Sequence, residues 1–208
     1  MLDVEAIVGK LAEIYPHVSC SLEYAKPYEL LFATRLSAQC TDVRVNLVTR
    51  GLFERFATLE SFAEADVAEL EEIVRPCGFY RHKARDLKLS ALRLLEVYGG
   101  ELPDTMEDLL TLSGVGRKTA NLILGELFGK PTIVVDTHCI RLSNRLGFAD
   151  TKEPEKVERR IAELVPPEER LPLCHRFVAH GREVCKAQRP ACGNCGINGL
   201  CNYYTGKD

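Results

Sequence analysis

Residues 112–138 read LSGVGRKTANLILGELFGKPTIVVDTH, and this stretch decides the fold that the rest of the chain is expected to adopt. Two glycines flank one valine at 114–116 and stand directly before two cations, Arg117 and Lys118. The apolar residues that follow recur at helical spacing, and a short β-branched run then ends at Asp136. The pattern predicts a helix, a glycine hairpin, a second helix and a loop that presents an acid.

The glycines have a physical reason to stand at the start of the second helix. A tight link between helices uses positive φ angles, which glycine adopts without steric cost. The first amides of a helix lack partners and carry the positive end of the helix dipole, so an anion can bind there when no Cβ blocks its approach. The spacing fits either a grip on a phosphate backbone or a purely structural turn that ends a helix.

Helical periodicity extends over most of the chain, and no strand-like alternation persists anywhere in it. Ahead of the glycines, Asp104 and Glu107 indicate a helix start with an acidic cap. The predicted helices cover residues 3–15, 28–36, 41–50, 59–65, 67–74, 82–97, 119–128, 137–146, 156–165 and 173–182.

Composition bounds the class of protein. At 208 residues, with 46% hydrophobic and 27% charged residues, the chain can form one large domain or two small ones around a buried core. No apolar run reaches membrane-spanning length, and Met1 leads into Asp3 and Glu5 instead of a signal peptide, so we expect a cytoplasmic protein, nucleoid-associated if prokaryotic. The net charge of −3 disfavours unselective nucleic-acid binding, but six Lys or Arg and one acid between Arg75 and Arg93 allow a local basic face.

Four of the nine cysteines crowd into the end of the chain with the spacing C-x6-C-x2-C-x5-C. They are Cys185, Cys192, Cys195 and Cys201. Four thiolates can bind zinc or hold an iron–sulfur cluster, and the single C-x-x-C arm disfavours zinc, whose structural sites usually pair two such arms. An odd total without a signal peptide argues against a disulfide framework. The other five cysteines are scattered and are expected in the core or near the surface.

LSGVGRKTA at 112–120, followed by VDTH at 135–138, resembles the helix-hairpin-helix and catalytic loop of the endonuclease III family of DNA glycosylases. SAQCTD at 37–42, GFYRHKA at 78–84 and the terminal cysteines fall where that family has its other motifs. The resemblance runs from about Pro27 to Cys201. Two residues depart from the family pattern. Ser113 stands where the family commonly has Pro, which should loosen the turn, and Cys40 stands where it commonly has Ala, which should alter a pocket wall.

The resemblance implies an all-α fold of two helical lobes. A helical barrel with the helix-hairpin-helix is expected over 20–130. An iron–sulfur cluster lobe carrying the catalytic Asp loop is expected over 1–19 with 131–208, and DNA is expected to bind in the cleft between the lobes. The implied activity is that of a bifunctional DNA glycosylase and AP lyase that removes oxidised pyrimidines in base excision repair. The expected partner is double-stranded DNA with damaged pyrimidines or abasic sites, and we expect a monomer that binds no membrane.

The resemblance also assigns roles to individual residues, including a [4Fe–4S] cluster on the four terminal cysteines. Lys118 should attack C1′ of the sugar as a Schiff-base nucleophile, and the helix dipole favours its neutral amine. Asp136 should stabilise the positive charge on the sugar. Gln39 should fill the space of the extruded nucleotide, and Phe79 should wedge into the base stack. The candidate DNA contacts are Gln39, Phe79, Gly114, Val115, Gly116, Arg117, His138, Lys186 and Arg189.

Some of these residue roles, and the proposed class of protein, have alternative interpretations. Phe79 would be a core residue in most proteins, and His138, Arg141 and Arg145 share a helix face that fits either solvent or a DNA groove. An adenine-specific mismatch glycosylase of the same superfamily lacks the lysine at position 118. A non-catalytic helix-hairpin-helix module would not need Asp136, and a small iron–sulfur electron carrier would not need the hairpin.

Overall fold

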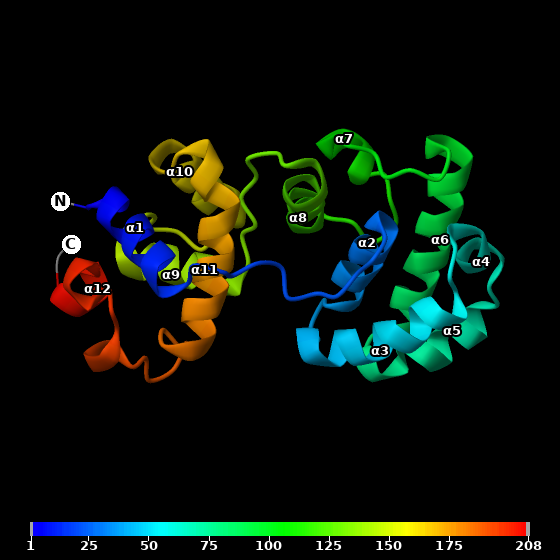
Figure 1. The fold of residues 1–208 in the computed structure, drawn as a ribbon, viewed down its shortest axis with the longest axis horizontal. Helices are drawn as coiled ribbons and strands as arrows, with labels where there is room; N and C mark the ends of the chain where they lie inside the picture. The colour runs from blue at the N-terminus through cyan, green and yellow to red at the C-terminus, as the bar shows by residue number, and fades with distance from the viewer. Residues whose placement is uncertain (1, 207–208) are drawn as a thin grey trace. The chain divides into compact units, whose positions relative to one another are not determined.

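The computed structural model describes residues 2–206, and every regular element in this range is a helix. The all-α class expected from the resemblance is therefore confirmed. The chain divides into two compact units (Figure 1): the central unit, Ser21–Phe128, and the terminal unit, which combines Met1–Cys20 with Gly129–Asp208. Within the described range, no helix is long and apolar enough to cross a membrane.

The central unit is a set of helices around an aromatic core. Its helices are α2 (Pro27–Leu36), α3 (Asp42–Arg55), α4 (Leu59–Glu64), α5 (Val67–Val74), α6 (Tyr80–Tyr98), α7 (Met106–Leu109) and α8 (Arg117–Phe128), with a 3₁₀ turn, η1, at Arg75–Cys77. Both α4 and α5 pack along α6, and α2 contacts α8 (Figure 1). The ring of Phe62 lies 4.8 Å from that of Phe32 and 5.3 Å from that of Phe56. The hairpin between α7 and α8 therefore stands on a packed helical frame.

Threonine side chains cap three helices of the central unit, α3, α4 and α7. Thr41 caps α3, because its Oγ1 accepts from the N–H of Arg44 at 3.4 Å. At α7, Thr105 Oγ1 accepts from the Asp108 N–H at 3.2 Å and donates to Asp108 Oδ2 at 2.7 Å. The acidic cap predicted from Asp104 and Glu107 is wrong, because Thr105 takes that position and Asp108 completes the cap.

The terminal unit brings the start of the chain together with its last eighty residues. Its helices are α1 (Val4–Ile14), α9 (Thr137–Leu146), α10 (Pro154–Leu164), α11 (Arg170–Glu183) and α12 (Asn202–Thr205), with 3₁₀ turns η2 (Pro167–Glu169), η3 (Cys192–Asn194) and η4 (Asn198–Leu200). The core joins α1, α9 and α11, and the rings of Phe148 and Phe177 meet at 5.9 Å. Gly181 lets α11 approach α9 closely, because a Cβ there would collide with the ring of His138.

Candidate active site and cysteine loop

An ion pair between Arg35 and Asp86 supports the hairpin, and the sequence analysis did not predict it. Arg35 Nε donates to Asp86 Oδ2 at 2.7 Å, and the Ser113 hydroxyl donates to Asp86 Oδ1 at 2.7 Å. The Ser90 hydroxyl in turn donates to the Ser113 carbonyl at 3.1 Å. Ser113, expected to loosen the turn, thus holds it through a hydrogen bond that proline could not make. The sequence holds one feature from which a structural role of Asp86 could have been predicted: it is the single acid in the basic segment from 75 to 93.

Gly114 and Gly116 are glycines for different structural reasons. Gly114 has φ +72°, and a Cβ there would strike Arg35 and Asp86, so both the turn and the packing require glycine. At Gly116, by contrast, no heavy atom outside its two chain neighbours lies within 4 Å of an added Cβ. The Val115 N–H bonds to the Leu112 carbonyl at 3.2 Å inside the turn. The backbone of the hairpin is therefore open to an approaching ligand at Gly116.

The candidate nucleophile follows immediately. Gly116 precedes the first residue of α8, and its carbonyl accepts from the Ala120 N–H at 2.9 Å. Arg117 and Lys118 occupy the first turn of this helix, and both side chains are exposed. A helix start of this kind combines a positive dipole end with an amine and a guanidinium, which suits contact with an anion.

Asp136 begins α9 as its N-cap. The carboxylate Oδ1 accepts from the Cys139 N–H at 2.7 Å, and the side chain is half-buried. The β-branched run before it is anchored, because Val135 is buried and the Val134 N–H donates to Cys174 Sγ at 3.3 Å. Lys118 belongs to the central unit and Asp136 to the terminal unit, so each is positioned by its own core. Their meeting at one sugar stays a prediction.

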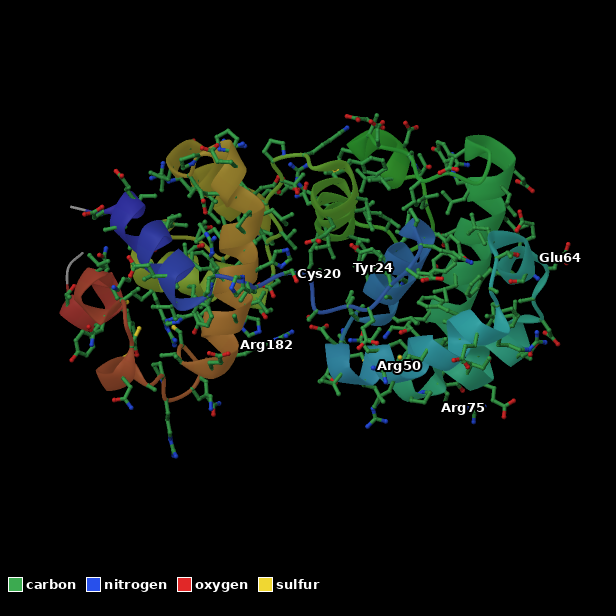
Figure 2. The ribbon with its side chains drawn as sticks, in the orientation of Figure 1. Cys20, Tyr24, Arg50, Glu64, Arg75 and Arg182 are labelled. Atoms are coloured by element: carbon green, nitrogen blue, oxygen red, sulfur yellow. The ribbon has the colours of Figure 1, made fainter. Side chains whose placement is uncertain are left out.

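Gln39 and Phe79 share an unusual backbone. Both have positive φ, 54° and 48°, in the left-handed region that residues with a Cβ seldom adopt. Gln39 is exposed, and Phe79 is 63% exposed, so the interpretation of Phe79 as a core residue is wrong. The guanidinium carbon of Arg75, which is labelled in Figure 2, lies 5.3 Å from the centroid of the Tyr80 ring. This contact stabilises the turn at Phe79, the residue before Tyr80. Strain of about 1–3 kcal/mol per residue persists only where the surroundings hold it, and it gathers at functional sites.

The four terminal cysteines line one pocket together with apolar residues of α9 and of the loop. Burial raises the pKa of the Cys195 thiol, and the neighbouring thiols Cys185, Cys201 and Cys192 raise it further. Among residues 2–206, no three His, Cys, Asp or Glu side chains converge as they would around one metal ion. The four thiols thus surround a pocket and do not meet at a point.

Polar groups contact three of these sulfurs. Arg145 Nη1 donates to Cys185 Sγ at 3.2 Å, His180 Nε2 hydrogen-bonds Cys195 Sγ at 3.4 Å, and the Cys201 thiol donates to the Arg145 carbonyl at 3.3 Å. The other ring nitrogen of His180 hydrogen-bonds the Tyr15 hydroxyl at 3.1 Å, which joins α1 to the loop. Four thiols around one pocket, with a guanidinium beside one of the sulfurs, fit an iron–sulfur group, which cysteine sulfurs hold.

Arg141 and Arg145 hold the backbone of the cysteine loop through their guanidinium groups, and a DNA contact of this helix face stays a prediction. Arg141 Nε donates to the Cys185 carbonyl at 3.0 Å, and Arg145 donates to the Lys186 carbonyl at 2.8 Å. His138 is half-buried, and its Nδ1 lies 3.0 Å from Arg141 Nη2. The side chains of Lys186 and Arg189 are exposed on the pinned loop.

Comparison with known proteins identifies the family. The model of the HhH-GPD superfamily of base excision DNA repair proteins matches residues 32–167, and that of the iron–sulfur binding domain of endonuclease III matches residues 185–201. Endonuclease III of Synechocystis is 44% identical over 92% of this chain and 88% of its own length. The Escherichia coli K12 enzyme is 41% identical over 95% of this chain and 93% of its own.

Comparison with solved structures supports the same family. A trapped covalent intermediate of an endonuclease III with DNA superposes with a TM-score of 0.93 at 40% identity, covering 99% of each chain. A thermostable thymine-DNA glycosylase shares the fold, with a TM-score of 0.87 at 21% identity over 98% of this chain and 97% of its own. The chain therefore belongs to the endonuclease III family of the HhH-GPD superfamily, and it is a base excision repair DNA glycosylase with an iron–sulfur binding domain.

Proposed function

We propose that the protein is a bifunctional DNA glycosylase and AP lyase acting on oxidised pyrimidines in double-stranded DNA. The observation that carries the proposal is the exposed Lys118 in the first turn of α8, beside the open backbone at Gly116. An amine at this place can reach a sugar while the helix start binds the adjacent phosphate. The similar endonuclease III solved as a trapped covalent intermediate with DNA supports covalent chemistry here as well.

The proposed reaction begins with extrusion of the damaged nucleotide, because its sugar is out of reach inside the duplex. Cleavage of the C1′–N bond builds positive charge on the sugar, and the Asp136 carboxylate stabilises it. The neutral Lys118 amine attacks C1′, so that an N–C1′ bond replaces the bond to the departed base and ring opening leaves an imine. The imine acidifies C2′, and loss of a C2′ proton expels the 3′ phosphate.

The positions of Gln39 and Phe79 support roles in base extrusion. Both side chains are exposed on strained turns of the central unit. An apolar wedge such as Phe79 can part a base step, and the amide of Gln39 can replace the hydrogen bonds that the opposite base loses. Contacts of Gly114, Val115, Gly116 and Arg117 with phosphate would hold the strand in register.

For the cysteine loop we propose a [4Fe–4S] cluster held by Cys185, Cys192, Cys195 and Cys201. The pocket that the four thiols share and the Arg145 guanidinium beside the Cys185 sulfur support it. When bound, the cluster cross-links the loop, so the role needs no redox step. The pinned loop would then present the exposed Lys186 and Arg189 to phosphates, and the half-buried His138 would add a further DNA contact.

A duplex with one thymine glycol tests the proposed activity, because hot alkali reveals base release and its omission reveals strand cleavage by the enzyme alone. We expect both products from the wild-type protein and no strand cleavage by Lys118→Ala. Asp136→Asn should keep binding and lose about 10²–10³ in base release. Lys10→Ala, which removes another exposed lysine, is the control and should change neither product. Base release without strand cleavage by the wild-type protein would contradict the lyase proposal.

A further inference from the structure

One buried cation joins the two strained turns of the central unit. Lys83 on α6 is fully buried, and its ammonium donates three hydrogen bonds to backbone carbonyls. The acceptors are the carbonyls of Leu36 at 2.9 Å, Ala38 at 2.8 Å and Cys77 at 2.8 Å. An ammonium has three donors, so the set is complete without an acidic partner.

The three acceptors lie where two helical segments end. Leu36 is the last residue of α2, and Ala38 directly precedes Gln39. Cys77 ends η1, two residues before Phe79. Carbonyls at helix ends have no partner within the helix and carry the negative end of its dipole, so one cation here stabilises both ends.

Further contacts join the same turns. The backbone N–H of Lys83 donates to the Phe79 carbonyl at 3.1 Å, so one residue holds this turn through both its amide and its side chain. The Cys40 thiol, next to Gln39, lies close enough to the Cys77 thiol to raise the pKa of that thiol beyond the effect of burial. The two turns therefore also meet at this pair of sulfurs.

We propose that Lys83 is a positioning residue that keeps the Gln39 and Phe79 turns in one fixed arrangement, so that both side chains enter the duplex together. The inference rests on the roles of Gln39 and Phe79 under the proposed function. Without the ammonium, three carbonyls, those of Leu36 and Cys77 buried and that of Ala38 partly buried, lose their donor, and each left-handed turn loses a contact that holds it. Lys83 touches no reacting atom, so its effect falls on base extrusion.

Lys83→Met tests the proposal, because methionine has similar length and no donor. Lys88→Met is the matched control: Lys88 lies on the same helix and bonds one backbone carbonyl, that of Ala65, at 2.7 Å, away from both turns. A 2-aminopurine placed opposite a thymine glycol fluoresces when its stacking is broken, and therefore reports entry of Gln39 and Phe79.

We expect Lys83→Met to lose most of the fluorescence rise and to release thymine glycol about 10²-fold more slowly, the effect of a misplacement near 1 Å. Borohydride trapping on a pre-formed abasic site, where the base is already gone, should fall much less. Lys88→Met should match the wild type in all three measurements. A role only in stability would instead lower all readouts in proportion to the folded fraction, and that result would overturn the proposal.

A second experiment tests the proposal without Lys83→Met, in case that variant does not fold. If the turns act as a unit, Gln39→Ala and Phe79→Ala should be non-additive, and the double variant should release base hardly more slowly than the worse single variant. Losses that multiply would overturn the proposal. A wild-type protein that releases no base would refute the proposed function, and normal base release with unchanged single variants would refute the roles of the two turns.

Discussion

Gly114→Ala and Gly116→Ala add the same methyl group two residues apart, and the structure predicts opposite consequences. At Gly114, φ is +72° and the added Cβ would strike Arg35 and Asp86. At Gly116, no heavy atom outside its two chain neighbours lies within 4 Å of the added Cβ. The first substitution should therefore destabilise the fold, and the second should leave stability almost unchanged while blocking a ligand.

The magnitude at Gly114 has two parts. A left-handed conformation costs an alanine about 1–2 kcal/mol. Displacing the partly buried Arg35–Asp86 pair weakens charge-assisted hydrogen bonds worth about 1.5–3 kcal/mol. The free energy of unfolding should thus fall by about 4 kcal/mol in total. Gly116→Ala should change it by no more than about 0.5 kcal/mol.

Urea unfolding followed by far-ultraviolet circular dichroism measures the stability change, and fluorescence anisotropy with an abasic-analogue duplex measures binding. Gly116→Ala should bind more weakly by about 10–100-fold, because one charge-assisted hydrogen bond to a phosphate is lost. If Gly116→Ala unfolds as readily as Gly114→Ala, or binds DNA as tightly as the wild type, the assignment of the open backbone to phosphate is wrong.

Three further predictions concern the cysteines and the loop. Cys195→Ala should abolish the brown colour of the protein and destabilise the terminal unit; a colourless, fully active wild-type protein with stoichiometric zinc would refute the iron–sulfur assignment. Lys186→Ala with Arg189→Ala should lower the slope of log K against log salt by about 2, because two phosphate contacts are lost, and an unchanged slope would remove the loop from the DNA interface. Burial raises the pKa of the Cys77 thiol from 9.0 to about 11, so its contribution to stability is complete below pH 9 and is lost as the pH rises through 11. Urea unfolding across this window should show that loss, and Cys77→Ala should remove it; a wild-type protein whose stability is flat over the window would contradict the buried thiol.

Local chemistry predicted the helices well where caps are explicit. The predicted helices 67–74 and 137–146 agree with α5 and α9, because Asp66 and Asp136 cap them through their own side chains. The iron–sulfur domain could also be predicted, because thiols spaced so closely have few alternatives. At α7 the local signal misled, since a threonine between two acids outcompetes both as a cap.

Contacts between distant residues could not be predicted. Lys83 looks like one more solvated cation in a basic segment, and only the folded chain places three carbonyls around its ammonium. The helix face of Arg145 suggests a DNA contact, which stays a prediction, and gives no sign that its guanidinium bonds carbonyls more than forty residues away. The Ser113–Asp86 bond spans 27 residues, so the departure at Ser113 could not be interpreted from the hairpin alone.

The central claim is that Lys118 forms a covalent imine with lesion DNA, and borohydride trapping tests it most directly because reduction turns the imine into a stable amine. Wild-type protein should cross-link to an abasic-site duplex, and digestion followed by mass spectrometry should place the adduct on Lys118. Lys118→Ala should bind the same duplex and give no adduct. An adduct on another residue, or trapping and nicking by Lys118→Ala at the wild-type rate, would contradict the account.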